Sequence, residues 1–120
     1  MILAGTFYHP PSGTVEDNHR LLQHIQDKVE SFLRDHPDHK GLIFICGDFN
    51  HTSTRITELA VKRATGLIQI VKVNTRDSGT FDWCLTNHPK LMDCPKQLPK
   101  LGSADHYTLL IHPSESSWTF

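Results

Sequence analysis

The sequence predicts an α/β protein built on a layered sheet, with the element order β-α-β-α-β-β-β. The spacing of apolar residues predicts this class, and the chain length and the longest apolar run limit its size and its setting. Short apolar runs of strand length alternate with two longer segments whose apolar residues recur at helical spacing. The chain has 120 residues, which is enough for one small domain. No apolar run approaches the length of a membrane span, so we expect no contact with a membrane.

The first strand is predicted over residues 2–8, because this apolar run ends at a double proline. A helix is predicted next. Thr14 with Asp17 three residues later forms a capping-box pattern, and His36-Pro37 ends the helix. Its apolar face is predicted to comprise Leu22, Ile25, Val29, Phe32 and Leu33.

The remaining elements follow from composition and spacing. They are strands at 42–46, 67–73, 80–86 and 107–112, a helix over about 54–65, and a loop at 87–101. Ile56, Leu59, Ala60 and Ala64 are predicted to share the buried face of the second helix, with Gly66 as its stop. In strand 80–86, Phe81, Trp83 and Leu85 should point away from Asp82, Cys84 and Thr86. We therefore expect one domain over 1–113 and a tail over 114–120.

The charge and the cysteine content bear on the partners and the cellular location to expect. Twelve Lys and Arg against thirteen Asp and Glu give a net charge of −1, which neither indicates nor excludes a nucleic-acid partner. The three cysteines are odd in number and have no C-x-x-C spacing, so we expect neither a zinc site nor a disulfide framework. Cys46 and Cys84 are predicted to be small buried side chains. The N-terminal residues lack the pattern of a signal peptide, so an intracellular location is expected.

Polar side chains stand at the ends of several predicted strands. Asp48 and Asn50 lie two apart after an apolar run, so they share one face of an extended chain. The alternative for this stretch is a turn, because Gly, Asp and Asn all favour turns. Tyr8 precedes the double proline, Asp82 lies within an aromatic strand, and Asp105-His106 directly precedes the last strand. Taken singly, Asp82 could instead cap a turn or pair with a lysine, and Asp105-His106 could form a turn that leads into the strand. Together they supply acids, an amide and an imidazole, which metal-assisted phosphodiester cleavage requires.

Four blocks carry a family resemblance: GTFYHPPSG, GDFN, TFDWCLTN and GSADHYTLL. In order and approximate spacing they resemble the endonuclease/exonuclease/phosphatase superfamily, over nearly the whole chain from Thr6 to Ile111. The tyrosine-bearing block and the LTN ending are most similar to the endonucleases of non-LTR (LINE-type) retrotransposons. The resemblance implies a Mg²⁺-dependent DNA endonuclease, with Mn²⁺ as an alternative ion, in a nuclear setting and associated with a reverse transcriptase.

The resemblance also implies a role for each site residue. Asp48 would orient or activate the attacking water beside the metal, and Asn50 would hold the scissile phosphate. His106 would stabilise charge on a phosphate oxygen, and Asp82 would accept a hydrogen bond from its ring and favour imidazolium. Asp105 would lie on the metal side of the site. Tyr8 would reach the phosphate from the neighbouring strand.

The chain departs from the superfamily pattern in two ways. The first half of the domain, with an asparagine and a metal-binding glutamate, is expected to be missing, so the fold would be a partial layered sandwich. Ala104 stands where a serine usually precedes Asp105-His106. Two further interpretations therefore remain open. The chain is either a non-catalytic remnant that binds a protein partner or the missing half-domain, or a lipid or inositol phosphatase of the same superfamily.

Overall fold

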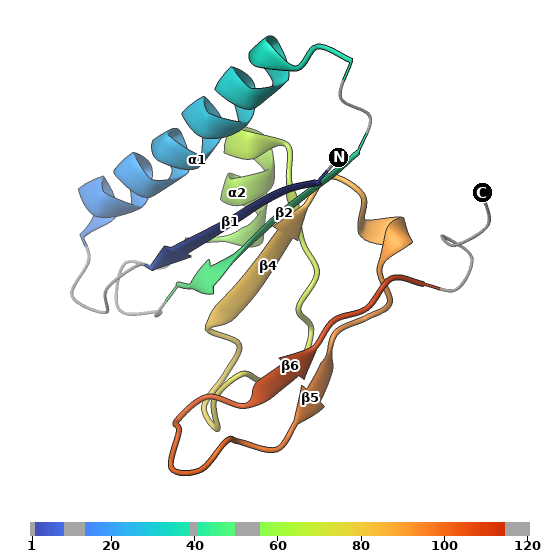
Figure 1. The fold of residues 1–120 in the computed structure, drawn as a ribbon. Helices are drawn as coiled ribbons and strands as arrows, with labels where there is room; N and C mark the ends of the chain where they lie inside the picture. The colour runs from blue at the N-terminus through green and yellow to red at the C-terminus, as the bar shows by residue number, and fades with distance from the viewer. Residues whose placement is uncertain (1, 9–13, 39–40, 50–55, 115–120) are drawn as a thin grey trace.

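The computed structural model describes residues 2–8, 14–38, 41–49 and 56–114. Within these ranges it confirms a small α/β protein with two α-helices and a mixed sheet (Figure 1). The elements are β1 (Ile2–Tyr8), α1 (Val15–Asp35), β2 (Leu42–Asp48), α2 (Glu58–Thr65), β3 (Ile68–Gln69), β4 (Asp82–Thr86), the 3-10 helix η1 (Pro89–Leu91), β5 (Lys96–Leu98) and β6 (Thr108–Leu110).

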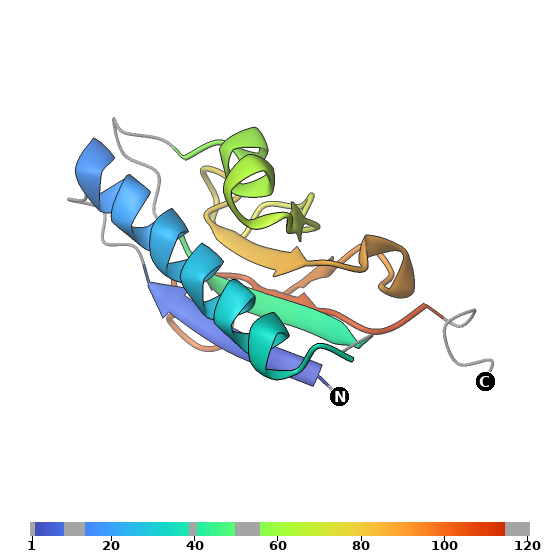
Figure 2. The same cartoon turned by 90° about the horizontal axis from the view of Figure 1, so that it is seen from above.

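The strands form two separate sheets. The main sheet has the order β1-β2-β4-β3, in which β1 runs parallel to β2 and the other neighbours are antiparallel. Helix α1 makes the crossover between the two parallel strands, as parallel pairs require. Strands β5 and β6 form an antiparallel pair of their own. Both helices lie on one side of the main sheet, and the β5–β6 pair lies on the other (Figure 2).

Helix α1 begins as its sequence predicts. The Asp17 amide donates to the Thr14 hydroxyl oxygen at 3.1 Å, and the Thr14 amide donates to the Asp17 carboxylate at 2.8 Å. This reciprocal capping box satisfies two amides that the helix itself leaves without partners. Leu33 does not belong to the buried face, because it is 41% exposed near the end of the helix.

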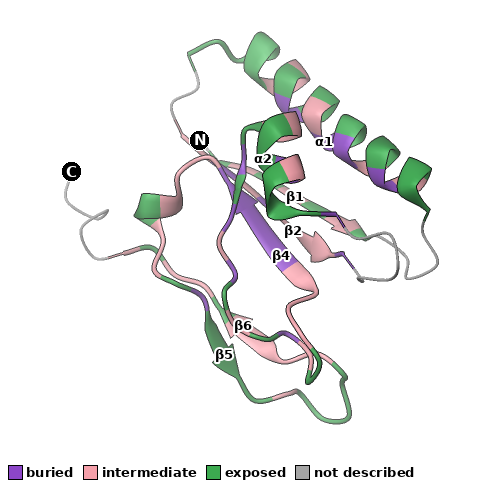
Figure 3. Ribbon diagram, turned by 180° about the vertical axis from the view of Figure 1, so that it is seen from behind, coloured by how far each residue is buried: buried purple, intermediate pink, exposed green. Residues whose placement is uncertain are grey.

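The core fills the space between the helices and one face of the main sheet. Its buried members are Leu22, Ile25, Val29, Ile43, Ile45, Phe49, Ile56, Val61, Leu67, Trp83 and Leu85. Strand β4 is the most continuously buried strand in Figure 3, with four of its five residues buried. No helix in the described ranges has both the length and the apolar character needed to cross a bilayer.

Three aromatic rings pack in series across this face near the ends of the strands. The ring centroids of Phe7 and Phe49 are 4.3 Å apart, and those of Phe49 and Trp83 are 4.6 Å apart. Gly47 lies beneath this row, and a Cβ there would come within 2.5 Å of the Phe7 ring and 2.3 Å of the Phe7 carbonyl oxygen. Glycine is therefore required at position 47 for β1 and the aromatic row to lie this close.

Helix α2 is shorter at its start than predicted. It begins at Glu58, because the Thr57 hydroxyl accepts a hydrogen bond from the Ala60 amide at 3.1 Å and caps the helix there. Leu59 is 54% exposed, whereas Val61 is fully buried, so the predicted buried face was wrong at Leu59 and omitted Val61. Gly66 ends the helix in the left-handed conformation with φ 74°, as predicted.

The strand predicted at 67–73 is reduced to the two residues of β3. Alternation persists, since Leu67, Gln69 and Val71 are all buried. The Gln69 side chain, however, accepts a hydrogen bond from the Val71 amide and donates to the Val71 carbonyl at 2.7 Å. The backbone of Val71 is therefore satisfied locally, and the ladder with β4 is not continued there.

The predicted loop at 87–101 contains regular structure. Residues Pro89–Leu91 form η1, and Lys96–Leu98 form β5, which pairs with β6. Every residue of β5 is exposed, so it lacks the buried alternation that identifies a strand from sequence. The last predicted strand, 107–112, is shortened to Thr108–Leu110 and pairs with β5 instead of the main sheet. Of the predicted tail, only Ser114 is described, and its amide bonds to the Leu91 carbonyl at 2.9 Å.

Candidate active site

The pairing of β2 with β4 places Asp48 directly opposite Asp82. The next pair along the ladder, Phe49 and Phe81, is hydrogen bonded, with the Phe49 amide 2.7 Å from the Phe81 carbonyl oxygen. Opposed residues in antiparallel strands alternate between bonded and non-bonded pairs, and side chains are closer in the non-bonded ones. Asp48 and Asp82 therefore form a close pair on the sheet face opposite the core.

His106 joins these two carboxylates from the segment just before β6. Its Nδ1 lies 2.6 Å from Oδ2 of Asp82, and its Nε2 lies 3.7 Å from Oδ2 of Asp48. This confirms the predicted contact between Asp82, in β4, and His106, which precedes β6. The His106 side chain is 37% exposed, so solvent reaches the group.

Arg76 completes the group and was not predicted from the sequence. Its Nη2 donates to Oδ2 of Asp48 at 3.2 Å and lies 2.8 Å from Nε2 of His106. A guanidinium can only donate, so Nε2 accepts this hydrogen bond and the ring proton sits on Nδ1, where it is donated to Asp82. This hydrogen bond corresponds to a neutral ring, and the imidazolium implied by the resemblance, which would require Arg76 to leave Nε2, stays a prediction.

Asp48, Asp82 and His106 could hold a metal ion. One ligand atom from each of the three residues lies within 4.8 Å of the others. Two carboxylates and one guanidinium leave the group with one net negative charge when the imidazole is neutral, which favours a cation. Arg76 nevertheless occupies the same space, because it already bonds Asp48 and His106. A metal ion and Arg76 would therefore compete for Asp48.

Thr75 forms hydrogen bonds to the start of β4 and to the segment that carries His106. Its hydroxyl oxygen accepts hydrogen bonds from the amides of Phe81 at 2.8 Å and Asp82 at 3.0 Å. Its carbonyl accepts from the amide of Tyr107, next to His106, at 2.8 Å. Thr75 is fully buried. It thus fixes the start of β4 relative to His106, while its neighbour Arg76 reaches the carboxylates.

A sequence signal for these two residues exists in the turn that follows them. Arg76 and Gly79 form an antiparallel bridge around Asp77-Ser78. Asp, Ser and Gly are turn formers, so the segment could have been predicted as a tight turn. That prediction would have placed Thr75 and Arg76 beside the start of β4, but not the direction of the Arg76 side chain.

An ion-pair cluster beside this turn braces the segment that carries His106. Oxygens of Asp77 accept hydrogen bonds from the Tyr107 hydroxyl at 2.6 Å and from Lys100 Nζ at 3.0 Å. The Tyr107 bond and then the Lys100 charge lower the pKa of Asp77. Bonding to Asp77 in turn raises the pKa of Lys100 and that of Tyr107. The cluster holds the turn against the segment before β6.

Two other predicted site residues, Tyr8 and Asp105, lie outside the group formed by the described residues. Tyr8 lies opposite Asp48 in the parallel register, on the same face, but it is 65% exposed and its side chain makes no hydrogen bond to a described residue. Asp105 is exposed and lies outside the three-residue ligand group. The prediction for Asn50 falls outside the described residues.

A cavity of about 370 Å³ adjoins the paired carboxylates. It is lined by Thr6, Phe7, Cys46, Gly47, Asp48, Asp82, Trp83, Cys84, Leu109 and Ile111. Two thiols meet there, with the Sγ atoms of Cys46 and Cys84 separated by 3.1 Å. This thiol–thiol hydrogen bond, together with burial, raises the pKa of Cys84, and the same bond lowers the pKa of Cys46. Leu109 and Ile111, in and after β6, add apolar side chains to the lining.

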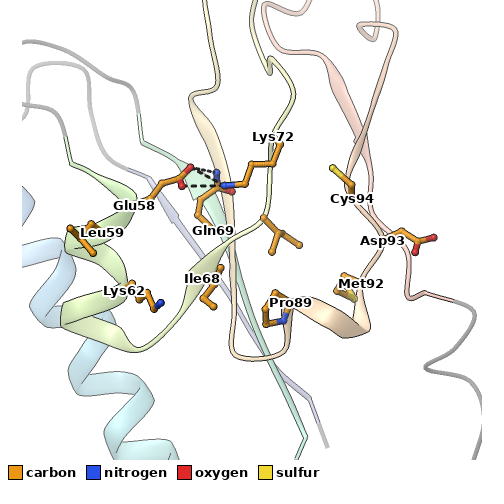
Figure 4. Close-up of a pocket in the computed structure, with 11 residues that line it drawn as sticks. Glu58, Leu59, Lys62, Ile68, Gln69, Lys72, Pro89, Met92, Asp93 and Cys94 are labelled. Carbon is orange, nitrogen blue, oxygen red and sulfur yellow. Dashed lines mark hydrogen bonds and ion pairs between the residues drawn. The ribbon is translucent and has the colours of Figure 1, made fainter.

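A larger hollow of about 540 Å³ lies elsewhere, between α2, β3 and the segment around η1 (Figure 4). Its lining includes none of the residues of the Asp48 group. Two of its polar side chains are engaged with each other, since Lys72 pairs with Glu58 at 3.1 Å. The carboxylates Asp48 and Asp82 thus line the smaller cavity and not this one.

Comparisons with known proteins provide no relative from which a role could be transferred. The acid pair, the histidine and the arginine must therefore be interpreted from their own geometry. The chain matches no protein-family model, no curated protein and no solved structure.

Proposed function

We propose that this chain carries the phosphodiester-cleaving site of a metal-dependent endonuclease. The observation that carries the proposal is the convergence of Asp48, Asp82 and His106, with His106 Nδ1 2.6 Å from Asp82. A carboxylate that holds an imidazole beside a second carboxylate is suited to general acid–base work on a phosphate ester. DNA as the substrate, a retrotransposon origin, a nuclear location and a partial endonuclease/exonuclease/phosphatase layering belong to the same proposal.

Each side chain has a distinct role in this proposal. Asp48 orients the attacking water and accepts its proton, while Asp82 holds the His106 ring through Nδ1. Arg76 pairs with the phosphate oxygens, because a guanidinium matches that geometry with two parallel hydrogen bonds. Its Nε is buried and has no hydrogen-bond partner among the described residues, so this donor becomes available to an anion only when the side chain turns. When Arg76 turns to phosphate, His106 Nε2 is released to face the substrate.

The metal would be held by oxygen ligands at this group. Mg²⁺ binds through one or two carboxylates together with water and substrate phosphates, and Mn²⁺ accepts the same ligands. Asp48 and Asp82 fit that donor set, and His106 adds a nitrogen that suits Mn²⁺ better than Mg²⁺. When bound, such an ion polarises a phosphoryl oxygen and lowers the pKa of a bound water.

A second candidate function is favoured by the two hydrogen bonds of Arg76. The hydrogen bonds from Arg76 to Asp48 and His106 already neutralise one carboxylate and satisfy the imidazole. Ion-pair networks of this kind also occur as purely structural features. In this alternative the chain is a non-catalytic domain that binds a partner, and the four side chains hold the two sheets together.

Metal binding and cleavage separate the two candidates. Mn²⁺ is titrated into the unchanged chain and followed by electron paramagnetic resonance, and nicking of supercoiled plasmid is measured with Mg²⁺. The proposal expects ion binding that is lost in Asp48→Asn, and nicking that falls at least about a hundredfold in His106→Ala. Asp38→Asn, at an exposed position in the turn after α1, is the matched control.

The outcomes assign the function directly. Neither ion binding nor nicking in a folded chain would support the non-catalytic domain. Activity toward inositol phosphates without plasmid nicking would retain the metal site but change the substrate class to a phosphatase. Nicking that survives both substitutions would remove the Asp48 group from the mechanism.

A further inference from the structure

Cys46 and Cys84 face each other across β2 and β4 as directly opposed residues. The bonded pair of Phe49 and Phe81 fixes the alternation along this ladder, so Asp48–Asp82 and then Cys46–Cys84 are non-bonded pairs. The two thiols therefore project from the same face at the closest spacing that an antiparallel sheet offers. Their Sγ atoms are 3.1 Å apart, and both cysteines are free.

The backbone geometry already suits a bond between these sulfurs. Opposed residues in non-bonded antiparallel pairs have Cα atoms about 4.5 Å apart. Disulfides span Cα separations of about 4.4–6.8 Å, with sulfurs about 2.05 Å apart. Closing the bond would therefore need the sulfurs to approach by about a further 1 Å, without a change in the register of the strands.

The two thiols differ in their access to solvent. Both cysteines line the cavity of about 370 Å³, but Cys46 is half-buried, whereas Cys84 is 3% exposed. Cys46 is therefore the thiol that a small reagent meets first, and Cys84 is in place to react second. Cys94 is exposed and lies in the segment before β5, away from this pair in the chain. It provides an internal control for non-specific oxidation.

We propose that Cys46 and Cys84 form a reversible intramolecular disulfide by exchange with a low-molecular-weight disulfide such as oxidised glutathione. Cys46 attacks one sulfur of the reagent, which forms a mixed disulfide and releases one thiol. Cys84 then attacks Sγ of Cys46, which forms the internal bond and releases the second thiol. Two protein thiols are oxidised, one reagent disulfide is reduced to two thiols, and excess thiol reverses both steps.

This modification site would act on the sheet that carries the carboxylates. The cross-link would join β2 to β4 two residues from Asp48 on one strand and two residues from Asp82 on the other. The disulfide would restrain the distance between β2 and β4, and this distance sets the spacing of Asp48 and Asp82. The inference goes beyond the proposed function, because it holds whether or not the carboxylates cleave a phosphodiester.

The test uses the unchanged chain with oxidised glutathione, followed by acid quenching, alkylation of remaining thiols and peptide mapping by mass spectrometry. We expect a Cys46–Cys84 cross-linked peptide that disappears on reduction with dithiothreitol. The Cys94→Ser variant should form the same cross-link. In Cys84→Ser, Cys46 should stop at the mixed disulfide with glutathione.

A second measurement asks whether the fold itself positions the pair. The mixed disulfide at Cys46 should convert to the internal bond at least about tenfold faster in the native chain than in the chain unfolded in urea, because the fold holds the second thiol in place. Equal rates would overturn the proposal. So would a native chain in which Cys94 is glutathionylated while Cys46 and Cys84 are both recovered alkylated.

Discussion

Arg76 donates a hydrogen bond to Nε2 of His106 at 2.8 Å, while Nδ1 of the same ring lies 2.6 Å from Asp82. Both ring nitrogens are therefore engaged, one as an acceptor and one as a donor. The histidine is held in one tautomer by two residues that lie 30 and 24 positions before it in the sequence. The tautomer of the His106 ring therefore indicates whether Arg76 is bonded to Nε2.

The first prediction concerns that tautomer. At mildly alkaline pH, the unchanged chain should show His106 with its proton on Nδ1 and an unprotonated Nε2. In Arg76→Met the donor to Nε2 is absent, so a population with the proton on Nε2 should appear. Long-range ¹H–¹⁵N spectra of the imidazole distinguish these forms. Arg63→Met, at an exposed position on α2, should leave the spectrum unchanged.

The second prediction concerns competition between Arg76 and a divalent cation. Arg76→Met should increase the affinity for Mn²⁺ by about tenfold, because a charge pair at this depth is worth on the order of 1 kcal/mol or more. Titration calorimetry measures the change, with Arg63→Met as the matched loss of positive charge. Equal affinities in the unchanged chain and in Arg76→Met would mean that Asp48 is not an ion ligand.

The third prediction concerns Thr75. Thr75→Val keeps the shape of the side chain but removes the acceptor for the amides of Phe81 and Asp82. Leaving these groups without a partner should lower the free energy of unfolding by about 2 kcal/mol or more. Urea denaturation measures this loss, and Thr75→Ser, which keeps the hydroxyl, should recover most of it. A neutral Thr75→Val would show that the hydroxyl does not anchor β4.

The fourth prediction is a pH dependence that originates at Asp77. Its pKa is lowered in the folded chain by the Tyr107 hydroxyl and then by Lys100. A lowered pKa contributes stability above the unfolded value of about 4, and this contribution is lost as the pH falls through the folded pKa. Below about pH 4, the difference in stability between the unchanged chain and Asp77→Asn should therefore shrink.

Thermal unfolding across the acid range measures that difference. The effect should be small, because the carboxylate is exposed and solvent screens exposed pairs. Asp38→Asn should show no such convergence with the unchanged chain. If Asp77→Asn follows the unchanged chain at every pH, the cluster with Tyr107 and Lys100 does not stabilise the fold.

The main layers of the fold could be predicted because their sequence patterns are strong. β1, α1 and β2 follow from apolar periodicity and from the Thr14 cap, which are local properties of the chain. The shortening of β3 could not be predicted in this way, because it depends on the Gln69 side chain satisfying the backbone of Val71. β5 was missed because an exposed strand carries no apolar alternation.

The candidate site was only partly accessible from sequence for a similar reason. The contact of Asp82 with His106 was implied by the family resemblance, in which Asp82 lies within one predicted strand and His106 directly precedes another. Arg76 and Thr75 belong to a turn, and their contacts depend on how that turn lies against β4 and β6. Side-chain direction in a turn is a tertiary property, so residue type and spacing did not indicate it.

The aromatic row of Phe7, Phe49 and Trp83 has a consequence for the carboxylates behind it. Gly47 and Phe49 flank Asp48 in the sequence, and Trp83 follows Asp82. Because successive residues of a strand point to opposite faces, the rings lie on one face of the sheet and the carboxylates on the other. A change in ring volume, or a side chain at Gly47, would push the strands apart on one face and so alter the spacing of the acids on the other. Substitutions in the hydrophobic core can therefore change the distance between the two carboxylates without replacing any residue of the site.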